Sequence, residues 1–152
     1  MRKARYSKEL IFLVCSFVVV SVAVFVVAGM SKRSQVYAQP GEVLKMNADQ
    51  VMEWVKDKPL AFVEFFSPTC SACQMAGPVL EKLVAEMGLN FAAVNVQYPK
   101  NHELMRELEV TATPTIFVFS NGEVVEGPVV GFIGEENYRA LFEKMVEMYA
   151  SE

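Results

Sequence analysis

The spacing of apolar residues over 42–149 predicts strands and helices that alternate along the chain. Two continuous apolar runs, 60–66 and 91–96, are typical of strands buried on both faces of a sheet. Between them, apolar residues recur at helical spacing, and caps, glycines or prolines mark where these segments end. We predict strands over 42–46, 60–66, 91–96, 115–119 and 123–130, and helices over 47–58, 71–87, 101–109 and 135–149.

The end of the chain has the pattern of a hairpin followed by a helix. Asn121-Gly122 joins the last two predicted strands and is typical of a tight β-turn. Gly127-Pro128 predicts a bulge or an edge irregularity, because proline cannot donate a ladder hydrogen bond. The whole order of elements predicts an α/β domain in which a central mixed β-sheet is flanked by helices.

The first 41 residues have a different pattern, which predicts a membrane anchor. Residues 10–30 are uncharged, and at 1.5 Å per residue a helix of this length spans about 31 Å, close to the thickness of the bilayer's hydrocarbon core. More basic residues precede the run than follow it, which favours a cytoplasmic N-terminus. We predict a basic cytoplasmic tail (1–9), a transmembrane helix (10–30), a tether (31–41) and an extracytoplasmic domain (42–152).

A cleaved signal peptide is the alternative for this segment. Val36-Tyr37-Ala38 has small residues at the positions that a signal peptidase reads. However, the apolar run is longer than a usual signal sequence, and the cleavage motif lies well beyond it. Both alternatives place the domain outside the cytoplasm. In the uncleaved form, which we predict, the protein is a single-pass membrane protein.

Charge changes sign between the two parts of the chain. Residues 1–38 have a net charge of +5 and residues 39–152 a net charge of −9, which together give the overall −4. An acidic domain without a basic run argues against nucleic acid as a partner. The membrane contact is therefore predicted to be made by the N-terminal helix alone.

The chemistry is concentrated in two of the three cysteines. Cys15 lies inside the predicted span, where it is expected to fill space. Cys70 and Cys73 follow a predicted strand and begin a predicted helix, so the unpaired N–H groups and the dipole of the helix favour a thiolate at Cys70. Cys73, one turn later, can close a disulfide with it. The pair predicts reversible dithiol–disulfide exchange.

Four features in this order resemble the thioredoxin-fold family: the Cys70–Cys73 pair after a strand, Pro78 inside the helix, Thr113-Pro114-Thr115 before a strand, and the Asn121-Gly122 hairpin with Gly131 beyond it. The resemblance covers about 42–149 and implies a thioredoxin fold, here preceded by the predicted transmembrane helix. It implies that Pro114 is a cis-proline lying against the redox-active disulfide. It also implies that Thr113 offers backbone groups to an extended substrate segment.

Glu64 is the third candidate catalytic residue. It lies mid-strand among phenylalanines, where the family resembled carries a buried acid. Burial is expected to raise its pKa, so that it can relay a proton to or from Cys73. The alternative is a strand-end carboxylate that is hydrogen bonded to backbone or water.

The sequence departs from the family at four positions around the motif. Thr69 stands where an aromatic residue is common, Ser71-Ala72 replaces Gly-Pro, and Ala93 stands where thioredoxins place a lysine near the buried acid. These differences bear on the redox potential and on the substrate surface, and they leave the thiol pair unchanged.

The resemblance implies a thiol-disulfide oxidoreductase without a cofactor, in which Cys70 attacks a disulfide and Cys73 resolves the mixed disulfide. We predict a reductase of disulfides in exported proteins, with the haem-site cysteines of apocytochrome c among the candidate targets. Such a reductase needs a transmembrane electron donor. A thiol oxidase or isomerase would use the same residues in the opposite direction, although the sequence lacks the histidine that the family's strong oxidants carry between the cysteines.

Two further classes stay open. Cys70 and Cys73 could hold Cu(I) or zinc, but two thiolates leave zinc short of four ligands, and His102 is predicted at the surface away from them. A binding module with a purely structural disulfide would close too short a loop to gain much stability. We therefore predict no metal site.

Overall fold

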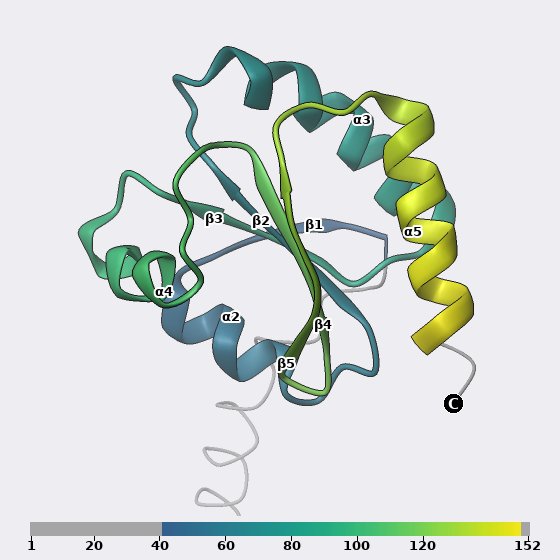
Figure 1. The fold of residues 1–152 in the computed structure, drawn as a ribbon, viewed down its shortest axis with the longest axis horizontal. Helices are drawn as coiled ribbons and strands as arrows, with labels where there is room; N and C mark the ends of the chain where they lie inside the picture. Colours follow the sequence, from purple (N-terminus) through teal and green to yellow (C-terminus); the bar gives the residue numbers. More distant parts are fainter. Residues whose placement is uncertain (1–40, 150–152) are drawn as a thin grey trace, which may run out of the picture. The chain divides into compact units, whose positions relative to one another are not determined.

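The computed structural model describes residues 41–149, which form one mixed five-stranded sheet with helices on both faces (Figure 1). The strand order is β1-β3-β2-β4-β5, in which β1, β3 and β2 are parallel and β4 and β5 are antiparallel to their neighbours. In chain order, the strands are β1 (Val43–Met46), β2 (Ala61–Phe66), β3 (Phe91–Asn95), β4 (Thr115–Ser120) and β5 (Glu123–Val130). The predicted fold class is confirmed.

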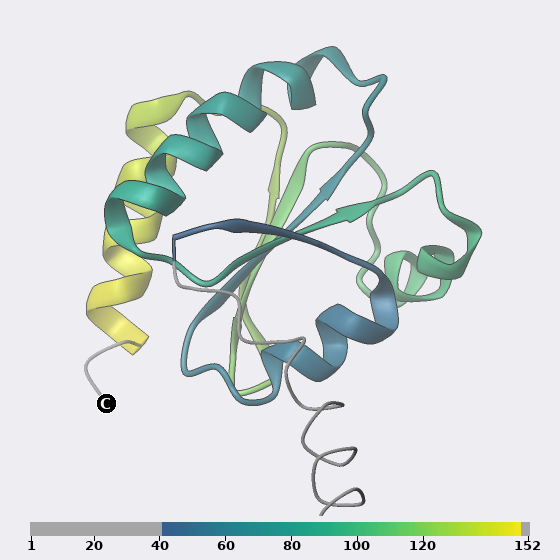
Figure 2. The ribbon, with the colours of Figure 1, turned by 180° about the vertical axis from the view of Figure 1, so that it is seen from behind.

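Two pairs of helices cover the two faces of the sheet, as both views show (Figures 1 and 2). One face packs against α3 and α5, and the other packs against α2 and α4. The helices are α2 (Ala48–Val55), α3 (Ser71–Met87), α4 (His102–Glu107) and α5 (Glu135–Tyr149), with a 3₁₀ turn, η1 (Pro99–Asn101), before α4.

The central strand β2 explains why residues 60–66 are apolar without alternation. Phe62 points toward α3 and α5, whereas Val63 and Phe65 point toward α2 and α4. Both sets are fully buried, so each face of the strand needs apolar side chains. Glu64 is the exception among these apolar residues. It lies two residues after Phe62 in the strand, so its carboxyl points to the same face of the sheet, toward α3 and α5.

Local signals fix the ends of the helices. The Asn47 side chain accepts a hydrogen bond from the Gln50 N–H while the Gln50 side chain accepts one from the Asn47 N–H, which is a capping box at the start of α2. Gly88 ends α3 in the left-handed conformation, with φ of +62°, where a glycine carries no steric penalty. Pro78 lies inside α3, as the sequence predicts.

The predicted irregularity in β5 is also present. The register between β4 and β5 shifts on both sides of Val118, and Gly127 and Pro128 lie within the first of these shifts. Gly127 has φ of +115°, and a Cβ built on it would lie 2.9 Å from the Ile116 carbonyl oxygen, so this position requires glycine.

Two details of the helices differ from the simple sequence pattern. Met75 has helical spacing with the packed residues of α3, yet 55% of it is exposed, because the buried stripe of the helix runs through Cys73, Ala76 and Leu80 instead. The helix predicted over 101–109 is present but shorter: α4 spans His102–Glu107, Asn101 belongs to the preceding η1 turn, and Leu108, which ends α4, is partly buried against the core on the α2 and α4 face.

The predicted tail, transmembrane helix and Cys15, together with nearly all of the tether, lie outside the described residues. Among helices within 41–149, none is both long and apolar enough to span a bilayer.

Candidate dithiol site

Cys70 is the N-cap residue of α3, at the point where the chain leaves β2. Its backbone is extended, and its sulfur accepts a hydrogen bond from the Cys73 N–H at 3.1 Å, in the way a capping oxygen does. Its carbonyl accepts the first helical bond, from the Gln74 N–H, also at 3.1 Å. The sulfur therefore lies at the positive end of a 17-residue helix.

The two thiols have different surroundings. Cys70 is half-buried, whereas Cys73, one turn into α3, faces the sheet and is 7% exposed. Both are free thiols in this structure.

Hydrogen bonding separates the proton affinities of the two sulfurs. Partial burial raises the pKa of Cys70, but hydrogen bonds with the side chains of Cys73 and Thr113 and with the backbone of Cys73 and Ala72 outweigh it, so the pKa lies below its ordinary value. Burial raises the pKa of Cys73, and its hydrogen bond to Cys70 raises it further. Cys70 is thus the thiol that ionises first and that solvent reaches, which is the combination an attacking thiol needs.

The segment before β4 lies against Cys70. The Cys70 thiol donates a hydrogen bond to the Thr113 carbonyl oxygen, with a sulfur–oxygen distance of 3.3 Å. The Thr113–Pro114 peptide bond is cis, and Pro114 is buried. The Pro114 carbonyl accepts a hydrogen bond from the Gly131 N–H at 2.7 Å, which ties this segment to the end of β5. The structure thus brings Thr113 and Pro114 to the nucleophile, although Thr113 lies 43 residues after Cys70 in the chain.

Glu64 lies behind the thiol pair, on the face of β2 that α3 covers. It is 6% exposed and stands beside Ala93 of β3 and Ile116 of β4 in the sheet register. With Cys73, it lines a cavity of about 210 Å³. Burial, followed by the negative charge of Glu81, raises the pKa of Glu64 to about 7. The carboxyl can therefore exchange protons near neutral pH, in a cavity that it shares with Cys73.

Three residues near the site were missed by the sequence analysis. Lys45 and Glu81 line the same cavity as Glu64. Helical periodicity could have identified Glu81, which lies about two turns after Cys73. Tyr138 is fully buried, and its hydroxyl donates a hydrogen bond to the Gly131 carbonyl at 2.9 Å. Burial, followed by the charge of Glu64, raises the pKa of Tyr138 to about 12, and no local signal marks this contact.

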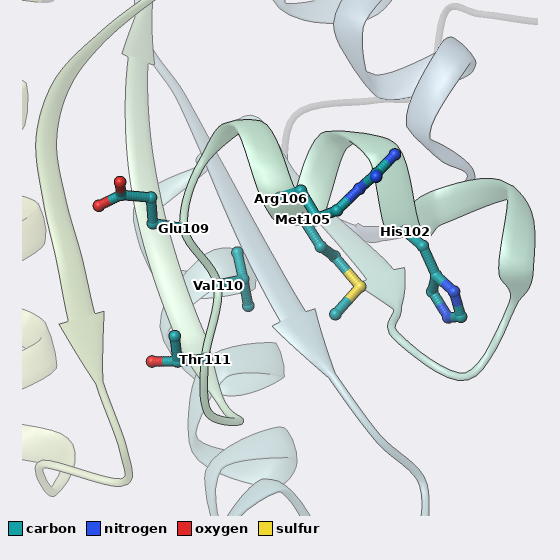
Figure 3. A pocket seen from close by; sticks show the side chains of 6 residues that line it. All are labelled: His102, Met105, Arg106, Glu109, Val110 and Thr111. Atoms are coloured by element: carbon teal, nitrogen blue, oxygen red, sulfur yellow. The ribbon is translucent and has the colours of Figure 1, made fainter.

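A second hollow lies beside α4 and carries no cysteine (Figure 3). Three of its side chains come from the helix and three from the segment that follows: His102, Met105, Arg106, Glu109, Val110 and Thr111. His102 is exposed, as predicted, and its Nε2 lies 3.1 Å from the Val96 carbonyl oxygen. In the part of the chain that the structure describes, no three His, Cys, Asp or Glu side chains are grouped so that they could hold a metal ion.

Comparison with known proteins gives one consistent family. The thioredoxin family model matches residues 42–147. Thioredoxin from Bacillus subtilis is 34% identical over 96 residues, which cover 63% of this chain and 91% of that protein. Thioredoxin from Listeria monocytogenes is 28% identical over 104 residues, which cover 68% of this chain and all of that protein.

Solved structures agree with the sequence relatives. A mutant thioredoxin from Halobacterium salinarum superposes with a TM-score of 0.64 at 29% identity, covering 71% of this chain and 94% of that one. The family match includes the segment that holds a Cys-x-x-Cys pair at the start of α3. This chain belongs to the thioredoxin family of thiol-disulfide oxidoreductases.

Proposed function

We propose that this protein is a reductase of disulfides in exported proteins, with Cys70 as the attacking thiol and Cys73 as the resolving thiol. The observation that carries the proposal is the difference between the two sulfurs. Cys70 is half-buried with a lowered pKa, whereas Cys73 is buried with a raised pKa and shares a cavity with Glu64.

The first step is attack by Cys70. Its thiolate displaces one sulfur of the target disulfide, which leaves as a thiolate, and a mixed disulfide joins Cys70 to the other sulfur. The ionised Cys70 no longer donates to the Thr113 carbonyl, which frees this oxygen to accept an N–H from an extended target segment. The segment of Thr113 and Pro114 thus positions the target chain beside the nucleophile.

The second step is resolution by Cys73. Its thiol gives a proton to the Glu64 carboxylate, and the resulting thiolate attacks the sulfur of Cys70. The bond between Cys70 and the target breaks, and the target leaves as its second thiolate. Two electrons have then passed to the target, and Cys70 and Cys73 form a disulfide.

The proposed location rests on the sequence of the first 41 residues. An uncharged run of this length with a basic preceding tail supports a single-pass membrane protein whose redox domain lies outside the cytoplasm. A domain in that place cannot draw on cytoplasmic NADPH, so its disulfide would be re-reduced by a transmembrane electron donor. Exported disulfide proteins, apocytochrome c among them, are the proposed targets.

The reduction potential of the Cys70–Cys73 pair tests the direction of electron flow. Titration of the protein against a dithiothreitol or glutathione redox buffer is expected to give a value near or below that of thioredoxin, about −270 mV. A value near about −120 mV, typical of a strong periplasmic oxidant, would make the protein an oxidant of exported thiols. Intermediate values, near about −180 mV, would favour an isomerase.

A trapping experiment tests the roles of the two thiols. Cys73→Ser is expected to accumulate a mixed disulfide between Cys70 and its target, because the pair no longer has a second thiol to resolve it. The matched control, Cys70→Ser, is expected to trap none. Equal trapping by both variants, or none by either, would contradict the assignment; non-reducing gel electrophoresis with mass spectrometry distinguishes these outcomes.

A further inference from the structure

The cavity behind Cys73 holds two charged side chains that the exchange mechanism leaves unused. Its volume is about 210 Å³, and its lining includes Cys73 and Glu64 together with Lys45 and Glu81. A cavity of this size that is lined by charged groups as well as apolar ones has room for several water molecules. Lys45 and Glu81 are exposed residues, so they lie where the cavity meets the solvent.

Glu81 reaches the cavity from α3, on the same side of the helix as Cys73. Positions four and eight residues after Cys73, Gly77 and Glu81, both line the cavity, as expected for one helical stripe. Gly77 has no side chain, and a Cβ built on it would meet nothing within 4 Å. The space between Cys73 and Glu81 is therefore open rather than filled by packing.

Lys45 reaches the same cavity from the sheet. In the register of the parallel strands, Lys45 of β1 and Glu64 of β2 both pair with Ala93 of β3, so the three side chains share one face. Two strand spacings, about 9.6 Å, separate the backbones of Lys45 and Glu64. The small Ala93 side chain leaves the lysine room to extend toward the carboxyl.

We propose that Glu81 and Lys45 are positioning residues for the resolving step, in which they act with opposite charges on the Glu64 carboxyl. The negative Glu81 opposes ionisation of Glu64, and the positive Lys45 favours it. Of the other groups that face Glu64, Cys73 is its proton donor and Tyr138 of α5 is a neutral phenol near neutral pH, while Ala93 and Ile116 on the flanking strands carry no charge. The proposal rests on the proposed function, because the charge of Glu64 matters only if Cys73 must lose a proton.

The balance of charge decides when Glu64 can act as a base. The proton leaves the Cys73 sulfur for a Glu64 oxygen, the thiolate attacks Cys70 in the mixed disulfide, and Glu64 then releases the proton to solvent through the cavity. At the start of these steps Glu64 must be ionised. Its pKa must nevertheless be high enough for the carboxylate to accept the proton of Cys73. Removal of Glu81 lets Glu64 ionise at lower pH, and removal of Lys45 has the opposite effect.

A two-phase thiol reaction isolates the resolving step. An aromatic disulfide with a coloured thiolate leaving group, such as dithionitrobenzoate, reacts first with Cys70 and releases one thiolate at a rate that depends on reagent concentration. Cys73 then displaces the second thiolate at a rate independent of reagent. The full chain carrying Cys15→Ser is used throughout, so that only the pair reacts, and the second rate is measured by stopped flow from pH 5 to pH 9.

The second rate is expected to fall at low pH as Glu64 becomes protonated, and this part of the pH profile is its acid limb. Glu81→Gln is expected to move the acid limb to lower pH by about 0.3 unit or more, which corresponds to a rate about twofold faster at pH 6. Lys45→Met is expected to move it to higher pH by a similar amount. The matched control is Glu86→Gln, on the same helix, because the Glu86 carboxylate contacts Arg139 at 2.7 Å rather than the cavity. The control is expected to leave the limb in place.

The result that would overturn the proposal is an unchanged limb in both Glu81→Gln and Lys45→Met. A shift that persists when Glu64→Gln is added would overturn it too, because the two residues would then act without the carboxyl. Failure of Cys73 as the resolving thiol, on which the proposed function depends, has a different signature, since the second phase would then be missing from every variant, including the Cys15→Ser parent.

Discussion

Glu64→Gln is expected to make the protein more stable at pH 8. The carboxyl has a pKa of about 7 in the folded chain and an ordinary value of 4.5, so between these values the folded state binds more protons than the unfolded state. Stability therefore falls as the pH rises from 4.5 to 7, and the full penalty applies above that range. Glutamine has a similar shape and no charge to lose, so its variant escapes this penalty.

The size of the effect follows from the two pKa values. The difference between 4.5 and about 7 corresponds to about 3 kcal/mol of folding free energy, at 1.36 kcal/mol for each pH unit. The glutamine amide must still find polar partners or water in the cavity, which offsets part of the gain. We expect Glu64→Gln to be more stable than the parent by about 1–3 kcal/mol at pH 8, and by much less at pH 5.

Urea unfolding followed by tryptophan fluorescence measures this directly. Trp54 is the only tryptophan in the sequence and is 5% exposed in α2, so its emission reports unfolding of this domain. Both proteins carry Cys70→Ser and Cys73→Ser, so that no thiol of the pair titrates in the range. Glu143→Gln, at an exposed position of α5, is the matched control and is expected to keep the parent's pH dependence.

The reasoning fails if the parent loses no stability between pH 5 and pH 8. It also fails if Glu64→Gln loses as much as the parent over that range, because another group would then be the source of the pH dependence. A gain of equal size at pH 5 and pH 8 would point to better packing rather than to removal of a buried charge.

Two further predictions concern the thiols and the core. Cys70 is expected to be alkylated by iodoacetamide at lower pH than Cys73, because their pKa values move in opposite directions; peptide mass spectrometry checks this, and identical profiles would contradict the assignment of the nucleophile. Asn101→Ala is expected to lower the free energy of unfolding by about 2–3 kcal/mol in denaturant titrations. The fully buried Asn101 side chain accepts a hydrogen bond from the Ala48 N–H and donates one to the Asn95 carbonyl, and alanine can do neither. Gln97→Ala, at an exposed amide, is expected to change stability by less than about 0.5 kcal/mol, and an equal loss would refute the argument.

The parts of the fold that the sequence predicts are those set by local pattern. The apolar runs 60–66 and 91–96 could be assigned to central strands, because a strand covered by helices on both faces needs apolar side chains throughout. The start of α3 could be placed at Cys70 because a helical pattern begins directly after it. Hairpin and helix ends followed from Asn121-Gly122 and Gly88, where a positive φ is needed.

The parts that the sequence could not predict depend on contacts between distant residues. Asn101 gives no sign that it is fully buried, since its partner Ala48 lies 53 residues away and its environment arises only when α2 and η1 meet. The cavity that joins Lys45 to Glu64 likewise requires the register of three strands. The exposure of Met75 could not be predicted either, because apolar residues at helical spacing do not reveal which of two adjacent stripes faces the sheet.

The geometry of the site also bears on the direction of electron flow. A dithiol becomes a strong oxidant when its reduced form is strongly stabilised, as happens when charged or strongly donating groups hold the attacking sulfur as a thiolate. In the described part of the chain, the hydrogen bonds that lower the pKa of Cys70 come from Cys73, Thr113 and the Ala72 backbone, none of which carries a cation. Neutral donors stabilise a thiolate less than a positive charge does. We therefore expect the reduced form to be favoured less than it would be beside a positive charge, in keeping with the proposed transfer of electrons from this pair to its targets.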